Sequence, residues 1–144
     1  NEKHISTGYL ECIGLINSFL LKAFGKGSHV ENGIYISNKW LRSKINNSDR
    51  GILGCNFSMH KADLLNINGF DERYLKPAVG EDTDLELRLR NNGIKIKTVK
   101  HLAVQYHLFH KTLPRDPSNL EILEDNRMKN ISYTPFGIQK TTTR

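Results

Sequence analysis

The feature that most constrains this chain is the stretch from residue 69 to residue 93, GFDERYLKPAVGEDTDLELRLRNNG. Its middle holds three closely spaced acids: Glu81, Asp82 and Asp84. We expect a helix over residues 81–92, because the macrodipole stabilises acids in a first helical turn and a glycine directly after a helix can end it. The stretch is therefore typical of a capped surface helix, or of a helix that Gly80 turns so that Glu81 and Asp82 face a cleft.

The composition fits a single domain over residues 1–144, with 38% hydrophobic residues to build a core. The 21 Lys and Arg residues exceed the 15 Asp and Glu residues, which leaves a formal net charge of +6. This excess favours anionic partners such as nucleotides or phosphates. The basic residues are scattered and no aromatic and basic module accompanies them, so nucleic acid is not an expected partner.

Two cysteines, Cys12 and Cys55, lie far apart in the sequence, which is typical of a reduced chain, with a single disulfide between them as the alternative. The apolar run from Ile13 to Phe24 is interrupted by polar residues and is shorter than the roughly 20 residues that a membrane span needs. We expect a cytoplasmic protein, with a peripheral position at the inner face of the membrane as an alternative. An exposed apolar stripe on this run would favour a homodimer.

Hydrophobic spacing predicts a mixed α/β chain with a small mixed sheet flanked by helices. Besides the helix over 81–92, helices are expected over 8–24, 38–44, 61–67 and 119–129. Strands are expected over 33–36, 52–59, 94–99 and 102–108. We expect the tail from residue 134 to residue 144 to be loosely ordered. The sequence has no Walker loop and no dinucleotide-binding glycine pattern.

Glu81 and Asp82 are candidate catalytic groups, because a carboxylate held in a cleft can act as a general base. Acids at the start of a helix are also common, so the residues alone leave catalysis and capping open. Asp82 and Asp84 do not predict a metal site together, since positions two apart on a helix point about 200° away from each other. Asp84 is therefore assigned to capping.

His107 and His110 form a His-x-x-His pair at the end of an expected strand. Residues three apart on extended backbone point to opposite faces, so both are not expected to bind one ion. A single neutral histidine beside carboxylates from elsewhere would suit Mn²⁺. His60 and His101 have no such neighbours and are expected at the surface.

Several short motifs follow one another in a fixed order: GCNFSM at 54–59, NGFDE at 68–72, GEDTDL at 80–85, Arg-Leu at 88–89, Gly93, and Tyr-His at 106–107. Together they resemble the C-terminal half of the catalytic domain of family 2 glycosyltransferases, which have the GT-A fold, and galactosyltransferase-like C-terminal regions. The resemblance covers residues 50–112 well.

The resemblance implies a role for each matching residue. Asp82 corresponds to the general base of inverting members, and Glu81 to the partner that holds the acceptor sugar. The residues that correspond to the lining of the substrate-binding cleft are Gly54, Cys55, Asn56 and Gly80. His107 corresponds to a metal ligand, with His110 as the fallback.

The N-terminal half of that family, which holds the nucleotide and the metal-binding Asp-x-Asp, has no counterpart in residues 1–144. The resemblance therefore implies an intact enzyme of bacterial-type polysaccharide biosynthesis that needs this missing half as a partner. It would transfer a hexosyl group from a nucleotide sugar, a UDP-sugar, to a saccharide or lipid-linked acceptor with inversion, using Mn²⁺ or Mg²⁺. The fragment alone would be inactive. The alternative is a non-catalytic carbohydrate-binding or partner-docking domain on the same scaffold.

Overall fold

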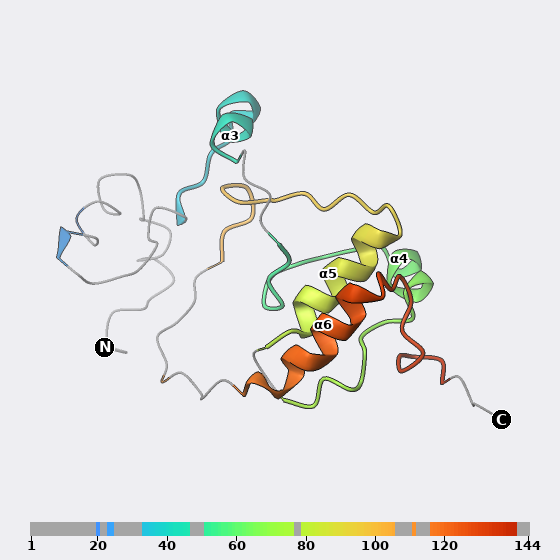
Figure 1. The fold of residues 1–144 in the computed structure, drawn as a ribbon. Coiled ribbons are helices and arrows are strands. Elements are labelled where there is room, and N and C mark those ends of the chain that lie inside the picture. The colour runs from blue at the N-terminus through green and yellow to red at the C-terminus, as the bar shows by residue number, and fades with distance from the viewer. Residues whose placement is uncertain are drawn as a thin grey trace. The chain divides into compact units, whose positions relative to one another are not determined.

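The computed structural model describes residues 20, 23–24, 33–46, 51–76, 79–105, 111 and 116–140 (Figure 1). The chain divides into two compact units: Asn1–Asp49 with Thr98–Phe109, and Arg50–Lys97 with His110–Arg144. The expected helix over 8–24 lies almost entirely outside the described residues. The assignment of one domain to residues 1–144 stays a prediction.

The described part of the first unit contains helix α3, Lys39–Ile45 (Figure 1). Asn38 caps it, since the Asn38 side chain accepts a hydrogen bond from the Leu41 N–H at 2.9 Å. The helix expected over 38–44 is thus confirmed. The segment before α3 contacts the second stretch of this unit, because the Ile36 N–H donates to the His101 carbonyl at 2.8 Å.

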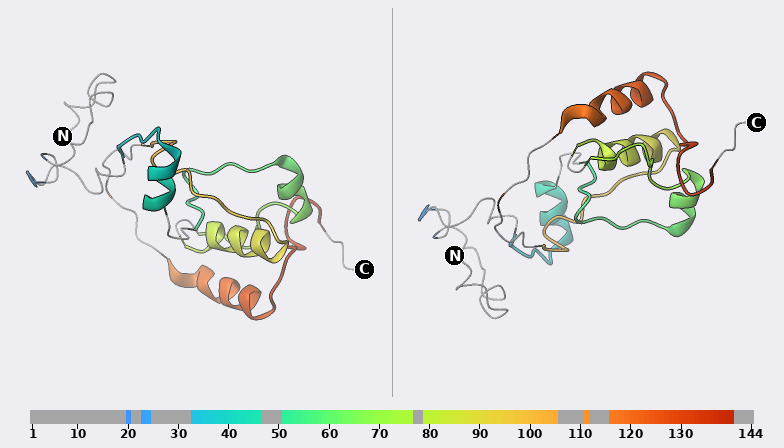
Figure 2. Two further views of the ribbon diagram at one scale, coloured as in Figure 1. Left: turned by 90° about the horizontal axis from the view of Figure 1, so that it is seen from above. Right: turned by 90° about the horizontal axis from the view of Figure 1, so that it is seen from below.

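The second unit contains three α-helices and a short 3₁₀ helix in its described residues. They are α4 (Lys61–Asn66), α5 (Glu81–Asn91), η3 (Pro117–Asn119) and α6 (Leu120–Met128). Helices α5 and α6 lie side by side (Figure 2). The three helices expected in this unit are confirmed to within one residue at each end. None of the described helices is long and apolar enough to cross a bilayer.

Between residues 33 and 140, the described segments contain one isolated β-bridge, Phe136 with Lys140, and no longer strand. Residues 52–59 include a turn, in which the Asn56 N–H donates to the Leu53 carbonyl at 2.8 Å. Residues 94–99 belong to neither a helix nor a strand. An alternating segment becomes a strand only beside a partner that completes its hydrogen bonds. The mixed sheet and the GT-A fold therefore stay predictions.

The apolar core of the second unit is small. Leu85 and Leu89, four residues apart on α5, pack against Ile67 at the end of α4, and all three are buried. The partly buried residues around them are Ile52, Met59, Leu64 and Ile94. With so few apolar side chains, buried polar groups take a large share of the interior.

The central polar contact is the ion pair between Asp84 and Arg88, both 0% exposed. The Arg88 Nε donates to Asp84 Oδ2 at 2.9 Å. The Arg88 Nη1 donates to the carbonyls of Ile67 and Gly69 at 2.8 and 2.7 Å, which fixes the end of α4. Asn126 on α6 donates to Asp84 Oδ1 at 2.7 Å. The assignment of Asp84 to helix capping is therefore wrong, because its side chain points inward and joins α5 to α6.

Asp71, the acid of the Gly-Phe-Asp-Glu motif, is a second buried carboxylate. It accepts hydrogen bonds from the guanidinium of Arg73 at 2.7 Å and from the Thr134 hydroxyl at 2.8 Å. Burial raises the pKa of Asp71, but the hydrogen bonds from Arg73 and Thr134 outweigh it and leave the pKa below its ordinary value. The acid is therefore held as a carboxylate that links its own segment to the tail at Thr134.

The tail from residue 134 to residue 140 packs against the unit, so its expected loose order is wrong for these residues. Thr134 is fully buried. The Asn68 side chain donates to the Thr134 and Gln139 carbonyls at 2.7 and 3.0 Å and accepts from the Gln139 N–H at 2.8 Å. The polar tail is ordered because one buried asparagine satisfies its backbone. Residues 141–144 lie outside the described residues.

Replacing Arg88 with methionine should lower the free energy of unfolding by about 3–5 kcal/mol, because Asp84 would stay buried without its cation. Urea denaturation measures this loss. The control is Arg127→Met, which breaks an exposed pair with Glu124 and should cost about 1 kcal/mol or less. Similar losses in the two variants would contradict the central role of the buried pair.

Candidate functional site

The candidate site lies at the start of α5, and Gly80 determines how the chain enters it. Gly80 has a left-handed φ of 96°, and its carbonyl accepts the Asp84 N–H at 2.8 Å. A Cβ on this residue would lie 2.9 Å from Cε1 of Tyr74. Both the backbone angle and the close ring require glycine here. Burial, and then the negative charge of Asp84, raise the pKa of Tyr74 far above its ordinary value, so its hydroxyl stays neutral.

Asp82 is partly buried in the first turn of α5, and both of its carboxylate oxygens accept backbone hydrogen bonds. Asp82 Oδ1 accepts the Thr83 N–H at 2.8 Å, and Asp82 Oδ2 accepts the Gly54 N–H at 3.1 Å. The structure thus brings together two residues that the sequence assigns to the site and that are 28 positions apart. The two donors orient the carboxylate without a cationic partner of its own among the described side chains.

Glu86, one helical turn after Asp82, also holds the segment that contains Gly54. Glu86 Oε2 accepts the Ile52 N–H at 2.7 Å, and Glu86 Oε1 accepts from Arg90 at 2.7 Å. A Cβ at Gly51 would overlap Glu86 Oε2. Sequence reasoning missed Glu86, although its spacing of four from Asp82 places the two acids on one face of a helix.

Glu81 is partly buried beside Asp82, and its Oε2 atom is buried. Within the described part of the chain, this oxygen has no hydrogen-bond donor. A buried oxygen without a donor carries a cost in stability. Glu81 places a second carboxylate directly beside Asp82.

The predicted cleft residues Cys55 and Asn56 are exposed, in the turn that begins at Leu53. Cys55 forms no disulfide. Next along the chain, the ring of Phe57 lies with its centroid 6.5 Å from that of Phe70. The turn leaves Gly54 against Asp82 and turns the two following side chains to the surface.

The predicted metal ligand His107 and its fallback His110 lie outside the described residues. In the segments that the structure describes, no three His, Cys, Asp or Glu side chains gather as a metal site. His101 was expected at the surface, and this is wrong: it is 5% exposed, with its Nδ1 2.8 Å from the Ile34 carbonyl. His60 is exposed, as expected.

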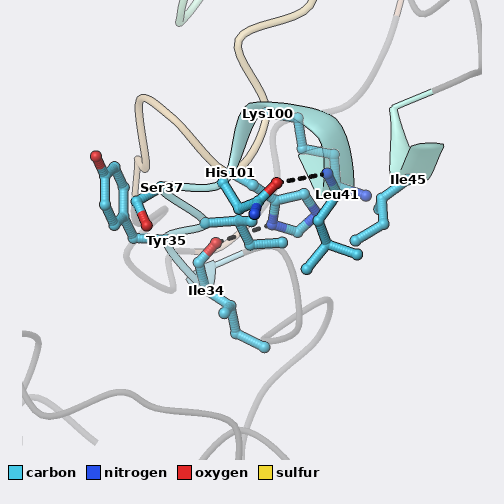
Figure 3. A pocket seen from close by; sticks show the side chains of 9 residues that line it. Ile34, Tyr35, Ser37, Leu41, Ile45, Lys100 and His101 are labelled. Atoms are coloured by element: carbon cyan, nitrogen blue, oxygen red, sulfur yellow. Dashed lines mark hydrogen bonds between the residues drawn. The ribbon is translucent and has the colours of Figure 1, made fainter. Parts of the chain in front are cut away.

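A cavity of about 590 Å³ lies within the first unit (Figure 3). Its described lining is mainly apolar, from Ile34, Ile36, Leu41 and Ile45, with Lys100 and His101 beside them. His101, one of its lining residues, is joined by hydrogen bonds to Ile34 and Ile36, which also line it (Figure 3). Among the residues that the structure describes, none of those predicted for catalysis or substrate binding lines this cavity.

The comparisons with known proteins gave one match. Residues 37–111 match the family described as the N-terminal domain of galactosyltransferase. The matched range contains the turn at Gly54 and the acids Glu81 and Asp82, together with the buried pair of α5. No curated protein and no solved structure matches the chain.

Replacing Gly80 with alanine should cost more stability than replacing Gly93, although both glycines have a left-handed φ. Gly93 has open space at its Cβ position, so Gly93→Ala should cost about 1–2 kcal/mol for the backbone alone. Gly80→Ala should cost about 1–3 kcal/mol more, because the new methyl group meets Tyr74. Urea denaturation of both variants measures the difference in the free energy of unfolding. Equal losses would show that the contact with Tyr74 adds no cost.

Proposed function

The chain belongs to the galactosyltransferase family and carries a glycosyltransferase domain, and from that premise we propose that Asp82 is the general base of a hexosyl transfer. The observation that supports this role is the carboxylate held between the N–H groups of Thr83 and Gly54, within the matched range. Donors fixed by the backbone keep a catalytic group in place before the substrate arrives.

In the proposed reaction, Asp82 takes the proton of the acceptor hydroxyl as its oxygen attacks the anomeric carbon of the donor sugar. The new C–O bond forms while the bond to the nucleoside diphosphate breaks, and the diphosphate leaves with the bonding electrons. A single displacement of this kind inverts the anomeric centre and needs one base and no covalent nucleophile. The proposed donor is a UDP-sugar, and the proposed acceptor is a saccharide or a lipid-linked saccharide.

Glu81 is proposed to hold the acceptor sugar. Glu81 is the first residue of α5 and is partly buried directly beside Asp82, so its carboxylate lies next to the proposed base. A sugar ring carries hydroxyls on adjacent carbons, which allows one to donate to Glu81 and the next to donate to Asp82. The proposed roles of these neighbouring acids therefore differ: one binds and one removes a proton.

We also propose that the domain has the GT-A fold of family 2 enzymes, and that residues 1–144 form its C-terminal, acceptor-side half. The nucleotide cradle would then be supplied by protein outside this sequence. His107, or His110 in its place, would contribute one ligand to a Mn²⁺ or Mg²⁺ ion, with the remaining ligands from outside the described residues. Such an ion offsets the charge of a leaving diphosphate. A cytoplasmic, membrane-peripheral location and a homodimer remain part of this proposal.

Replacing Asp82 with asparagine in the intact enzyme should lower kcat by about 10²–10⁴-fold, because the amide cannot take the acceptor proton. Steady-state release of UDP measures kcat, and calorimetry should show that UDP binding is kept. The control is Glu124→Gln on α6, an exposed acid that should leave kcat unchanged. An unchanged kcat in Asp82→Asn would favour the alternative, a non-catalytic carbohydrate-binding or partner-docking domain.

Residues 1–144 alone should show little or no transfer when supplied with a UDP-hexose and Mn²⁺, since the proposed nucleotide cradle is absent from them. The same assay of released UDP applies. Turnover above the uncatalysed hydrolysis of the donor would contradict the assignment of the nucleotide site to protein outside these residues.

A further inference from the structure

We propose that Asn119, which lies beyond the family match at residues 37–111, is a positioning residue for Glu81 and Asp82. The inference rests on the proposed function, because it assigns to Asn119 the task of holding the segment that leads into the catalytic acids. Asn119 neither touches the substrate in this proposal nor takes part in proton transfer.

The contact that supports the proposal is a bridge made by one side-chain nitrogen. Asn119 is 3% exposed, and its Nδ2 donates to the Lys76 carbonyl at 2.7 Å and to the Val79 carbonyl at 2.9 Å. Both N–H groups of the amide are thus used on one segment, at two points three residues apart. Val79 directly precedes Gly80, where the left-handed turn into α5 is made.

The position of Asn119 is itself well fixed. Asn119 ends η3, in which Pro117 sets the first backbone angle and the Asp116 side chain accepts the Ser118 N–H at 3.0 Å. Seven residues further on, Asn126 donates to Asp84. Seven residues span about two helical turns, so the two asparagines lie on the same side of this helical segment. One contacts the approach to α5, and the other contacts its first turns.

Two side chains lie close to Gly80 and limit how the chain can enter α5. A Cβ at Gly80 would lie 2.9 Å from Tyr74 Cε1 and 3.8 Å from the Cβ of Asn119. Tyr74 and Asn119 therefore both crowd the Cβ position of Gly80, and Asn119 also holds the preceding carbonyl. Without the amide, two carbonyls would lose their donor and the segment would be free to shift. A shift of about 1 Å in a reacting group can cost about 100-fold in rate.

The chain offers a matched control at the opposite end of α5. The side chain of Asn91 donates to the Ile131 carbonyl at 2.6 Å, so it also joins α5 to the segment around α6. Asn119→Ala and Asn91→Ala each remove an asparagine amide that donates to distant backbone. Both should reduce stability, but only Asn119→Ala removes a contact to the segment before Glu81.

The first readout needs no activity and uses residues 1–144. The Asp84 N–H, which donates to the Gly80 carbonyl, should exchange with deuterium about tenfold faster in Asn119→Ala. The Asn92 N–H, which donates to Arg88 at the other end of the helix, should keep its rate in this variant. The Asp84 N–H should keep its rate in Asn91→Ala. An unchanged rate for Asp84 in Asn119→Ala would overturn the proposal, whatever the chain catalyses.

The second readout is steady-state kinetics of the intact enzyme. Asn119→Ala should lower kcat at least about tenfold with the donor KM unchanged, and Asn119→Ser, which keeps one donor, should recover part of the loss. If Asn119→Ala fails to fold, Asn119→Ser carries both measurements with a smaller expected effect. An equal loss of kcat in Asn91→Ala would show a merely structural role and overturn the proposal. If the unsubstituted intact enzyme lacks transferase activity, the proposed function fails, and with it the catalytic meaning of this contact.

Discussion

The buried pair of Asp84 and Arg88 is the interaction on which the rest of the second unit depends. It joins the end of α4, the middle of α5 and, through Asn126, helix α6. Two charges removed from water are stable only when each has good partners, and here each charged group has contacts from more than one segment. The apolar core nearby is small, so this pair largely determines which segments meet.

The acids of helix α5 have different roles, which depend on the face of the helix that each one occupies. Asp84 points into the interior, whereas Asp82, two residues earlier, is on a face about 200° away and receives the N–H of Gly54. Glu86, one turn after Asp82, holds the neighbouring backbone. The candidate base therefore lies on a helix whose opposite side is locked in place, which suits a group that must be oriented before its substrate binds.

The helices and their ends could be predicted from local patterns. Asn38 at the start of α3 and the glycines on either side of α5 act as their residue types lead one to expect. The predictions that failed concern residues whose burial depends on a partner distant in the sequence. Thr134 lies in a polar tail, yet it is buried because its hydroxyl donates to Asp71 and its carbonyl accepts from Asn68. His101 has no notable neighbours in the sequence, yet it is buried with its ring against the Ile34 carbonyl.

The sequence by itself determined the helix over α5, the glycine before it, and the likeness that made Asp82 a candidate base, because these depend on neighbouring residues and on the order of motifs. Only the tertiary structure decided that Asp84 is buried, that Asp82 meets Gly54, and that Asn119 holds the approach to Gly80. Each of these contacts joins residues that are distant in sequence or depends on which side of a helix is covered. Local propensity predicts neither the distant contact nor the covered side of the helix. The same aspartate is stable in water or, when buried, beside a cation.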